Sequence, residues 1–278
     1  MLGKLMKYEI KATARWFLPL YGTMLIIAVI NRFTLFSPYI EYRYMYAEPS
    51  VSLPGNSFFS VIRGIMSALM MFIYIMMFVG LFVATLIVTI QRYYRNLLGD
   101  EVYLMFTLPV KSWQHILSKL LISMLWHFLS SIAAICSILV LIPGEATAKI
   151  PDVFKRITEL IGIHGIIILV LAIVSGLVFS ILKIYTAVSL GHLFNKHRLL
   201  LSFVMYLGIE AVSQFIFMLL TIIAAETVFK PWKGISLFML NADQFNCLFG
   251  IMAILTALLS AGLFILTGYL LNRKLNLE

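Results

Sequence analysis

Long apolar runs separated by short polar segments form the main pattern of this chain. Each run has about 20 residues or more, the length of an α-helix that crosses the hydrocarbon core of a bilayer. Lipid cannot satisfy backbone N–H and C=O groups, so unbroken apolar runs predict membrane-spanning helices. We therefore predict an all-α polytopic membrane protein with a single transmembrane domain, residues 1–278. The six spans are expected at about residues 16–36, 64–90, 116–142, 161–190, 199–225 and 247–271.

A basic amphipathic stretch, residues 1–17, precedes the first run. On a helical wheel its basic residues fall on one side and its apolar residues on the other. We expect an elbow helix on the membrane surface, with Pro19 allowing a bend into the first span. The residues assigned to this elbow are Lys4, Lys7, Glu9 and Lys11.

Glu9 does not fit the amphipathic pattern, because it falls within the apolar stripe. A carboxylate there needs a cationic or hydrogen-bonding partner. Two interpretations remain open. Glu9 either tilts to the interface and stays hydrated, or it pairs with Arg92 or Arg95 at the end of the second span.

Composition and charge agree with a membrane protein and predict its orientation. The chain is 62% hydrophobic and 12% charged, with a formal net charge of +9. Lys and Arg favour the cytoplasmic side. Placing the N-terminus in the cytoplasm puts most basic residues inside, including Arg92, Arg95, Arg198, Arg273 and Lys274. We expect both termini in the cytoplasm of a multi-pass protein of the cell (inner) membrane, and no nucleic-acid partner.

The polar segment between the second and third runs predicts a short cytoplasmic helix. Gly99 can end the incoming helix, Asp100 can cap a new one, and Pro109 stops it, which gives a helix over residues 100–108. Its side chains include Tyr103, Leu104, Met105 and Phe106. So much apolar surface indicates either docking to a partner or packing against the bilayer interface.

Three segments resemble the permease subunits of type-two ABC exporters. They are Leu5–Lys11, Leu97–Pro109 and Ser118–Leu120. The resemblance implies that the surface elbow precedes six spans and that residues 100–108 are a coupling helix. Its residues expected to contact a separate ABC ATP-binding subunit are Asp100, Glu101, Tyr103, Leu104, Phe106 and Thr107.

The resemblance also implies a second permease, either a copy or a relative, with ATP and Mg bound by the partner subunit. This chain has no Gly-x-x-x-x-Gly-Lys-Ser/Thr loop, which is the usual backbone cradle for ATP phosphates. We therefore expect no cofactor on this chain and no enzyme activity of its own.

Two ionisable residues fall inside the predicted spans. Lys183 in the fourth and Glu210 in the fifth lie at similar depths from the cytoplasmic turn. One interpretation is an intramembrane ion pair between adjacent antiparallel helices. The other is that Lys183 extends toward the interface while Glu210 is protonated or bonded to Gln214 or Ser213.

The outer segments and the small residues complete the pattern. We expect outer loops at residues 36–63, 143–160 and 226–246, the last as a re-entrant hairpin.

Small residues at Gly176 and Ser180, and a similar face starting at Gly250, predict helix-packing seams. Cys136 and Cys247 are expected to be buried, without a disulfide.

An ATP-driven exporter explains the elbow, the apolar cytoplasmic helix and the missing ATP loop together. Its cargo is expected to be hydrophobic or amphipathic, such as a peptide, a drug or a lipid-like molecule. The alternative is an ion-coupled secondary transporter that uses Lys183 and Glu210. An intramembrane enzyme ranks third, because the histidines are dispersed and no metal-ligand or catalytic motif occurs.

Overall fold

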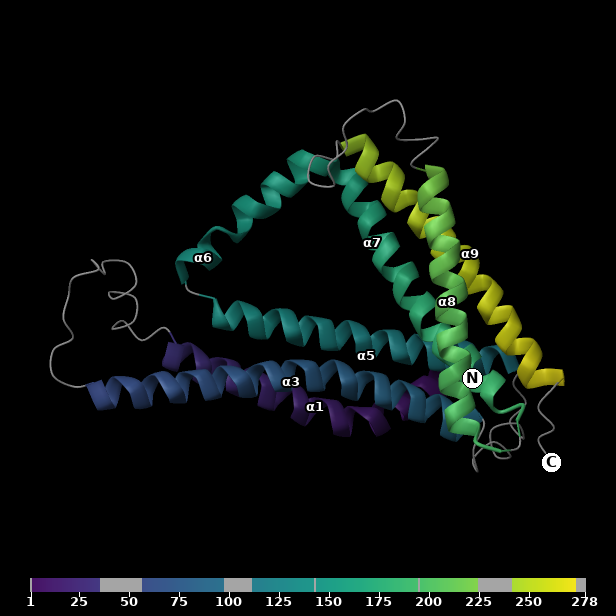
Figure 1. The fold of residues 1–278 in the computed structure, drawn as a ribbon, viewed down its shortest axis with the longest axis horizontal. Coiled ribbons are helices and arrows are strands. Elements are labelled where there is room, and N and C mark those ends of the chain that lie inside the picture. Colours follow the sequence, from purple (N-terminus) through teal and green to yellow (C-terminus); the bar gives the residue numbers. More distant parts are fainter. Residues whose placement is uncertain are drawn as a thin grey trace. The chain divides into compact units, whose positions relative to one another are not determined.

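The computed structural model describes residues 2–35, 57–97, 112–142, 144–194, 196–224 and 242–273. Every regular element in these ranges is a helix, and Figure 1 shows their course. The predicted coupling helix, residues 100–108, lies outside the described ranges, as does most of the predicted hairpin at 226–246. The helices are α1 (Leu2–Leu35), α3 (Ser57–Leu97), α5 (Ser112–Leu141), α6 (Gly144–Ala148), α7 (Ile150–Gly191), α8 (Arg198–Ala224) and α9 (Ala242–Arg273).

Within the described residues, six helices are long and apolar enough to cross a membrane, in agreement with the predicted number of spans. The chain is therefore an all-α, multi-pass membrane protein. The candidate spans are Met6–Thr34, Gly64–Arg95, Trp113–Leu141, Ala146–Gly191, Arg198–Ile223 and Ala242–Asn272.

Several helices extend beyond their apolar runs. α3 begins at Ser57 and α9 at Ala242, both inside segments predicted as outer loops. The predicted outer loop at 143–160 is largely helical, because α6 and the start of α7 occupy it, and its location outside the membrane stays a prediction. The apolar runs do not predict these additional helical turns, because charged residues lie between the apolar positions there. Such charges interrupt a run without breaking the helix.

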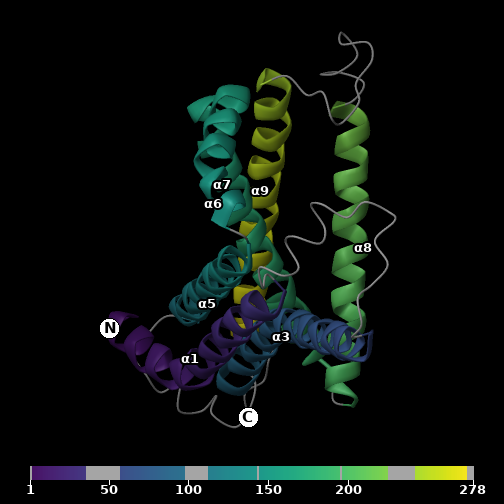
Figure 2. The same cartoon turned by 90° about the vertical axis from the view of Figure 1, so that its left-hand side faces the viewer.

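α1 is one continuous helix that includes Pro19. The ribbon changes direction part-way along α1 in Figure 2. Proline inside a helix removes one backbone donor and commonly bends the axis. No helix boundary separates residues 2–17 from the first span, and the surface location of this elbow stays a prediction.

A break divides α7 at Gly162, whose φ of 72° and ψ of 168° are not helical. This backbone conformation is essentially restricted to glycine. α7 therefore consists of a shorter helical part, residues 150–161, and a longer one, residues 163–191. Figure 1 shows the change of direction between them.

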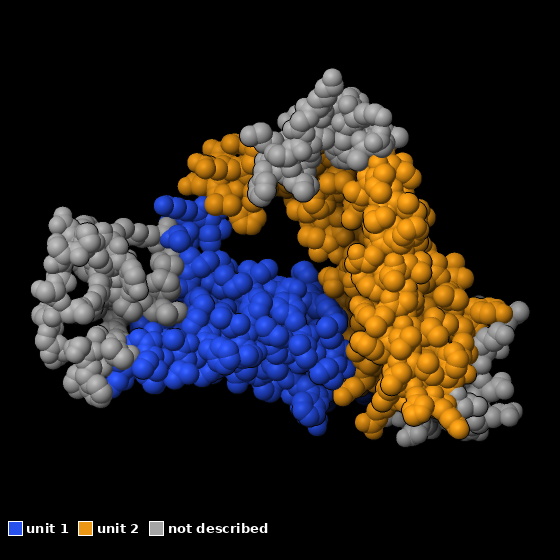
Figure 3. Space-filling model, in the orientation of Figure 1, with its two compact units in different colours: residues 1, 3–88, 125–151 blue, residues 2, 89–124, 152–278 orange. Residues whose placement is uncertain are grey.

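The contacts divide the chain into two compact units, coloured in Figure 3. Unit 1 contains residues 1, 3–88 and 125–151, and unit 2 contains residues 2, 89–124 and 152–278. α3 and α5 each contribute residues to both units.

The interior of unit 1 combines apolar packing with hydroxyl contacts between helices. Phe17 of α1 stacks on Trp126 of α5, with ring centroids 4.4 Å apart. The Ser130 hydroxyl on α5 lies 2.9 Å from Tyr21 Oη of α1 and 2.9 Å from Thr85 Oγ1 of α3. Ser130 thus connects three helices, and these contacts give the hydroxyl groups hydrogen-bonding partners that lipid cannot provide.

Both cysteines are free, and Cys136 is exposed on the chain. The expectation that it is buried is wrong. Residues Ala133 and Ala134 on the same helix are buried, whereas Cys136 lies on a different side of α5. An apolar residue of a membrane helix can face lipid as readily as protein, so composition alone does not predict its exposure.

Candidate functional site

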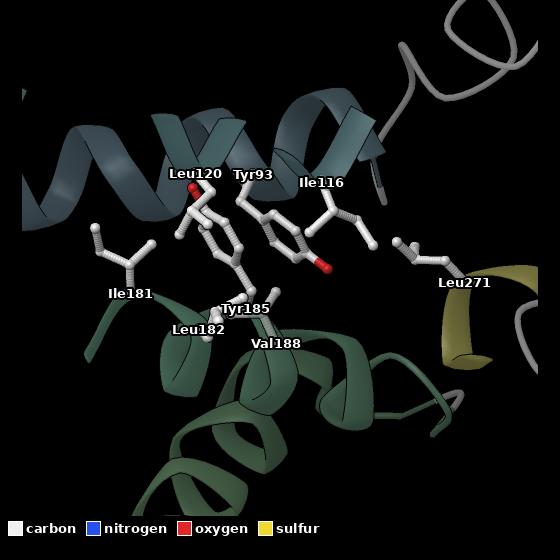
Figure 4. Close-up of a cluster of buried hydrophobic side chains, with 8 residues drawn as sticks. All are labelled: Tyr93, Ile116, Leu120, Ile181, Leu182, Tyr185, Val188 and Leu271. Carbon is white, nitrogen blue, oxygen red and sulfur yellow. The ribbon is translucent and has the colours of Figure 1, made fainter. Parts of the chain in front are cut away.

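The two helices that flank residues 98–111 pack on α7 close to their ends. α3 ends at Leu97 and α5 begins at Ser112. One helical turn from those ends, Tyr93 and Ile116 enter a common buried cluster with α7. Figure 4 shows this inner cluster, which consists of Tyr93, Ile116, Leu120, Ile181, Leu182, Tyr185, Val188 and Leu271.

Two tyrosine rings lie at the centre of the inner cluster. Tyr93 of α3 and Tyr185 of α7 are fully buried and stack with centroids 4.0 Å apart and an interplanar angle of 9°. Both hydroxyls have partners. Tyr93 Oη lies 2.6 Å from Ser189 Oγ of α7, and Tyr185 Oη lies 2.8 Å from Ser123 Oγ of α5.

These contacts fix the orientation of three helices relative to one another. A buried hydroxyl without a partner is costly, so each tyrosine has one favourable position. Tyr93 joins α3 to α7, and Ser123 joins α5 to the same face of α7. This cluster is not predictable from the sequence, because tyrosine and serine inside an apolar run give no periodic signal.

α9 contacts α7 through threonine and serine side chains at two levels. Thr186 Oγ1 lies 2.9 Å from Thr267 Oγ1, and Ser175 Oγ lies 2.7 Å from Thr256 Oγ1. The predicted small-residue seams do not make this contact. A Cβ added at Gly176 or Gly250 would meet no atom within 4 Å.

The structure brings together the two ionisable residues that the sequence places inside spans. Lys183 Nζ of α7 lies 2.5 Å from Glu210 Oε2 of α8. Gln214 Nε2 donates to the other carboxylate oxygen at 3.1 Å, and Lys183 Nζ lies 4.8 Å from the centroid of the Phe179 ring. Ser213 donates to the backbone oxygen of Glu210 at 2.8 Å, not to its carboxylate.

The ion pair is more buried on the lysine side than on the glutamate side. The side chains of Lys183 and Glu210 are 11% and 31% exposed. If the helices separated in lipid, each charge would lose its partner, which is energetically costly. The pair and its glutamine partner therefore hold α7 and α8 together at this level. The geometry favours pairing over the interpretation in which Lys183 extends away from Glu210.

α7 and α8 approach each other closely at Gly191. A Cβ added at Gly191 would lie 2.1 Å from Ser202 Oγ and 2.6 Å from the backbone N and Cα of Ser202. Only glycine allows the first turn of α8 to approach α7 so closely. His197, next to Lys196 and Arg198 at the start of α8, has a positive φ of 56°.

His192 is buried just after α7. Its Nδ1 donates to the Val188 carbonyl oxygen at 3.3 Å, and its ring meets Tyr94 edge-on at 4.9 Å. Burial lowers the pKa of His192 and the nearby Arg198 lowers it further, while the bond to Val188 opposes the change. The neutral imidazole is therefore the form that suits the folded chain.

The described elbow residues divide into exposed lysines and one buried carboxylate. Lys7 and Lys11 are exposed, whereas Glu9 is buried. The Thr13 hydroxyl donates to the Glu9 backbone oxygen at 2.7 Å. Lys4 lies in α1, but its side chain is outside the described part. The pairing of Glu9 with Arg92 or Arg95 stays a prediction.

The residues assigned to the coupling helix all lie outside the described ranges. They are Asp100, Glu101, Tyr103, Leu104, Phe106 and Thr107. Within the ranges that the structure describes, no three His, Cys, Asp or Glu side chains gather where they could hold a metal ion. No family model, no curated protein and no solved structure matches this chain.

Proposed function

We propose that this chain is the membrane-spanning permease subunit of an ATP-driven exporter in a bacterial inner membrane. ATP hydrolysis takes place on a separate ABC ATP-binding subunit, which holds ATP and Mg. The proposal is supported by the six spans and by the resemblance of residues 97–109 to the coupling segment of such permeases.

One observation carries the proposal most strongly. The helices on both sides of residues 98–111 are held on α7 by the stacked Tyr93 and Tyr185 and by the Ser123 hydroxyl. A displacement of that segment by a partner therefore moves α7, since packed helices shift as rigid bodies. A cytoplasmic loop with no mechanical role does not require such anchoring.

The same contacts continue from α7 to the remaining helices of unit 2. The Lys183–Glu210 pair connects α7 to α8, and the Thr186–Thr267 contact connects α7 to α9. In the proposed mechanism, closure of the ATPase on its nucleotide displaces the coupling helix, and these contacts transmit the movement. The pathway then opens to the other side of the membrane.

The exporter requires a second permease, a copy or a relative, because six spans alone rarely enclose a pathway. Its cargo is hydrophobic or amphipathic, in keeping with the apolar side chains of the spans. Membrane lipid surrounds the chain, and nucleic acid has no role.

The coupling variant Tyr103→Glu/Phe106→Glu tests the proposal in the purified permease–ATPase complex. We expect vanadate-sensitive ATP hydrolysis to fall at least tenfold while the permease keeps its size-exclusion profile and helical content. The matched control, Tyr44→Glu/Tyr46→Glu, makes the same change in the predicted outer loop and should retain activity. Equal activity of both variants contradicts the proposed docking.

An ion-coupled secondary transporter is the second candidate, and the Lys183–Glu210 pair favours it. Ionisable residues inside spans are common at ion-coupling sites. This candidate predicts that vesicles containing the chain alone accumulate substrate when an ion gradient is imposed. The exporter predicts no accumulation under those conditions and requires the ATPase and Mg-ATP.

A further inference from the structure

The first part of α7, residues 150–161, is an amphipathic helix. Apolar residues recur at spacings of three and four, which places them on one side of the helix. The charged residues lie on the opposite side. The apolar stripe consists of Ile150, Val153, Phe154, Ile157, Leu160 and Ile161, and the charged side chains are Asp152, Lys155, Arg156 and Glu159.

The apolar stripe is not covered by the part of the chain that the structure describes. Val153, Phe154 and Leu160 are 52%, 66% and 70% exposed. An amphipathic helix in a soluble domain normally buries this side against a core. Here the stripe needs a different apolar environment.

The length of α7 shows that these residues are not needed to cross the bilayer. The candidate span Ala146–Gly191 has 46 residues. At 1.5 Å per residue it measures about 69 Å, whereas a hydrocarbon core is about 30 Å thick. Residues 163–191 measure about 43 Å on the same basis and suffice alone.

The segment before Gly162 fits neither the hydrocarbon core nor bulk water. Residues 150–161 extend about 18 Å, too short to span the core. Their four charged side chains are costly in hydrocarbon, and their apolar stripe is costly in water. The break at Gly162 allows this helix to leave the direction of the span.

We propose that residues 150–161 lie along the lipid–water interface of the bilayer, with phospholipid as their partner. The stripe sinks beneath the headgroups, and Lys155 and Arg156 reach lipid phosphates. Continuity supports lipid over a protein partner. Beyond the break, Ile163 and Ile167 of the span are also exposed, so exposed apolar side chains continue from the stripe into the span. This inference does not depend on the proposed export function.

Nitroxide labels on neighbouring residues test this inference in the full chain. Cys136 and Cys247 are first replaced by alanine, and single cysteines are introduced as Phe154→Cys and Lys155→Cys. The labelled proteins are placed in phosphatidylglycerol–phosphatidylcholine vesicles. Spin relaxation then compares collisions with oxygen, which concentrates in lipid, and with a water-soluble nickel chelate.

We expect the label at 154 to favour oxygen and to lie about 5–10 Å below the phosphates. The label at 155 should favour the nickel chelate. A second pair, Leu160→Cys and Glu159→Cys, repeats the comparison if either first variant fails to fold. Three results overturn the inference: both labels favour nickel, both favour oxygen, or the label at 154 is shielded from both reagents by protein.

Discussion

Tyr93 of α3 stacks face to face on Tyr185 of α7, with ring centroids 4.0 Å apart, one helical turn from the end of α3. The hydroxyl of each tyrosine meets a serine, and the two serines lie on different helices. Together the stack and its hydroxyl contacts join the helices on both sides of residues 98–111 to one face of α7. The proposed transmission of movement from residues 98–111 to α7 depends on this connection.

Replacing Tyr93 tests how much the stack contributes to stability. Tyr93→Phe keeps the ring but loses the contact with Ser189, so we expect a loss of about 1 kcal/mol. Tyr93→Ala also removes the packed ring and should cost about 3 kcal/mol or more. Reversible unfolding in mixed detergent micelles measures both values. The exposed Tyr8 supplies the control Tyr8→Ala, which should leave stability unchanged.

The same variants separate stability from coupling. In the proposed complex, Tyr93→Phe retains the stack, so we expect it to keep most ATP hydrolysis. Tyr93→Ala should lower hydrolysis even at a temperature where the permease stays folded. If Tyr93→Ala hydrolyses ATP as fast as the unchanged protein, α3 does not act through α7.

The ion pair can be tested by comparing single and double variants. Lys183→Leu or Glu210→Leu leaves one charge without its partner. We expect each to cost about 3 kcal/mol or more, because neither the described part of the protein nor lipid offers the remaining charge an oppositely charged partner. The double variant removes both charges and should lose less than either single variant. Unfolding midpoints of the four proteins show whether this order holds.

The double variant also distinguishes the two candidate functions. In an exporter the pair serves to hold α7 against α8, and the two leucines of the double variant can still pack these helices together. Such an exporter should therefore keep its ATP-driven activity. An ion-coupled transporter should lose accumulation completely, because its coupling site is gone. Loss of ATP-driven activity in a stable, folded double variant counts against the structural role that we assign to the pair.

Gly191 provides a prediction that depends only on steric overlap. An alanine Cβ there overlaps the backbone of Ser202, so Gly191→Ala must separate α7 from α8 or displace their turn. We expect a loss above about 2 kcal/mol, in the range of overpacking. Gly208→Ala is the matched control, since its Cβ meets no atom within 4 Å. It should be neutral or stabilising by up to about 1 kcal/mol, because alanine favours helix.

His192 predicts a pH dependence of stability. Burial lowers its pKa in the folded chain, so the unfolded chain binds a proton more readily. The free energy of unfolding is therefore highest above the unfolded pKa of about 6.5, and it falls as the pH drops below that value. The midpoint of thermal unfolding should decrease between pH 8 and pH 5.5. The decrease should be smaller in His192→Gln than in the unchanged protein.

The exposed His197 serves as the control for this experiment. His197→Asn preserves a residue type that tolerates positive φ and should show the same decrease as the unchanged protein. Identical decreases in all three proteins would mean that His192 does not control the acid sensitivity.

The sequence predicts the membrane architecture well because the bilayer imposes a simple length and polarity requirement. All six apolar runs correspond to helices of spanning length. The ends are less predictable, as residues 150–161 illustrate. Charged side chains at Asp152 and Glu159 interrupt the apolar run, yet they lie on the opposite side of the same helix.

The sequence predicts the ion pair of the candidate site but not its tyrosine stack, for physical reasons. Lys183 and Glu210 are conspicuous because charges are rare in lipid, and two antiparallel helices give them matching depths. The stacking of Tyr93 on Tyr185 depends on how three helices rotate and pack, which local sequence does not specify. Gly191 has the same limitation, since its partner Ser202 belongs to the next helix.

The docking of residues 100–108 on a separate ATPase is the central claim, and site-specific photocrosslinking tests it most directly. A benzoylphenylalanine is introduced at Phe106, and at Tyr44 as a control, in cells that contain the complete transport system. We predict that only position 106 crosslinks to a polypeptide that also binds a photoreactive ATP analogue. Absence of that product from an active transporter, or the same product from position 44, contradicts the account.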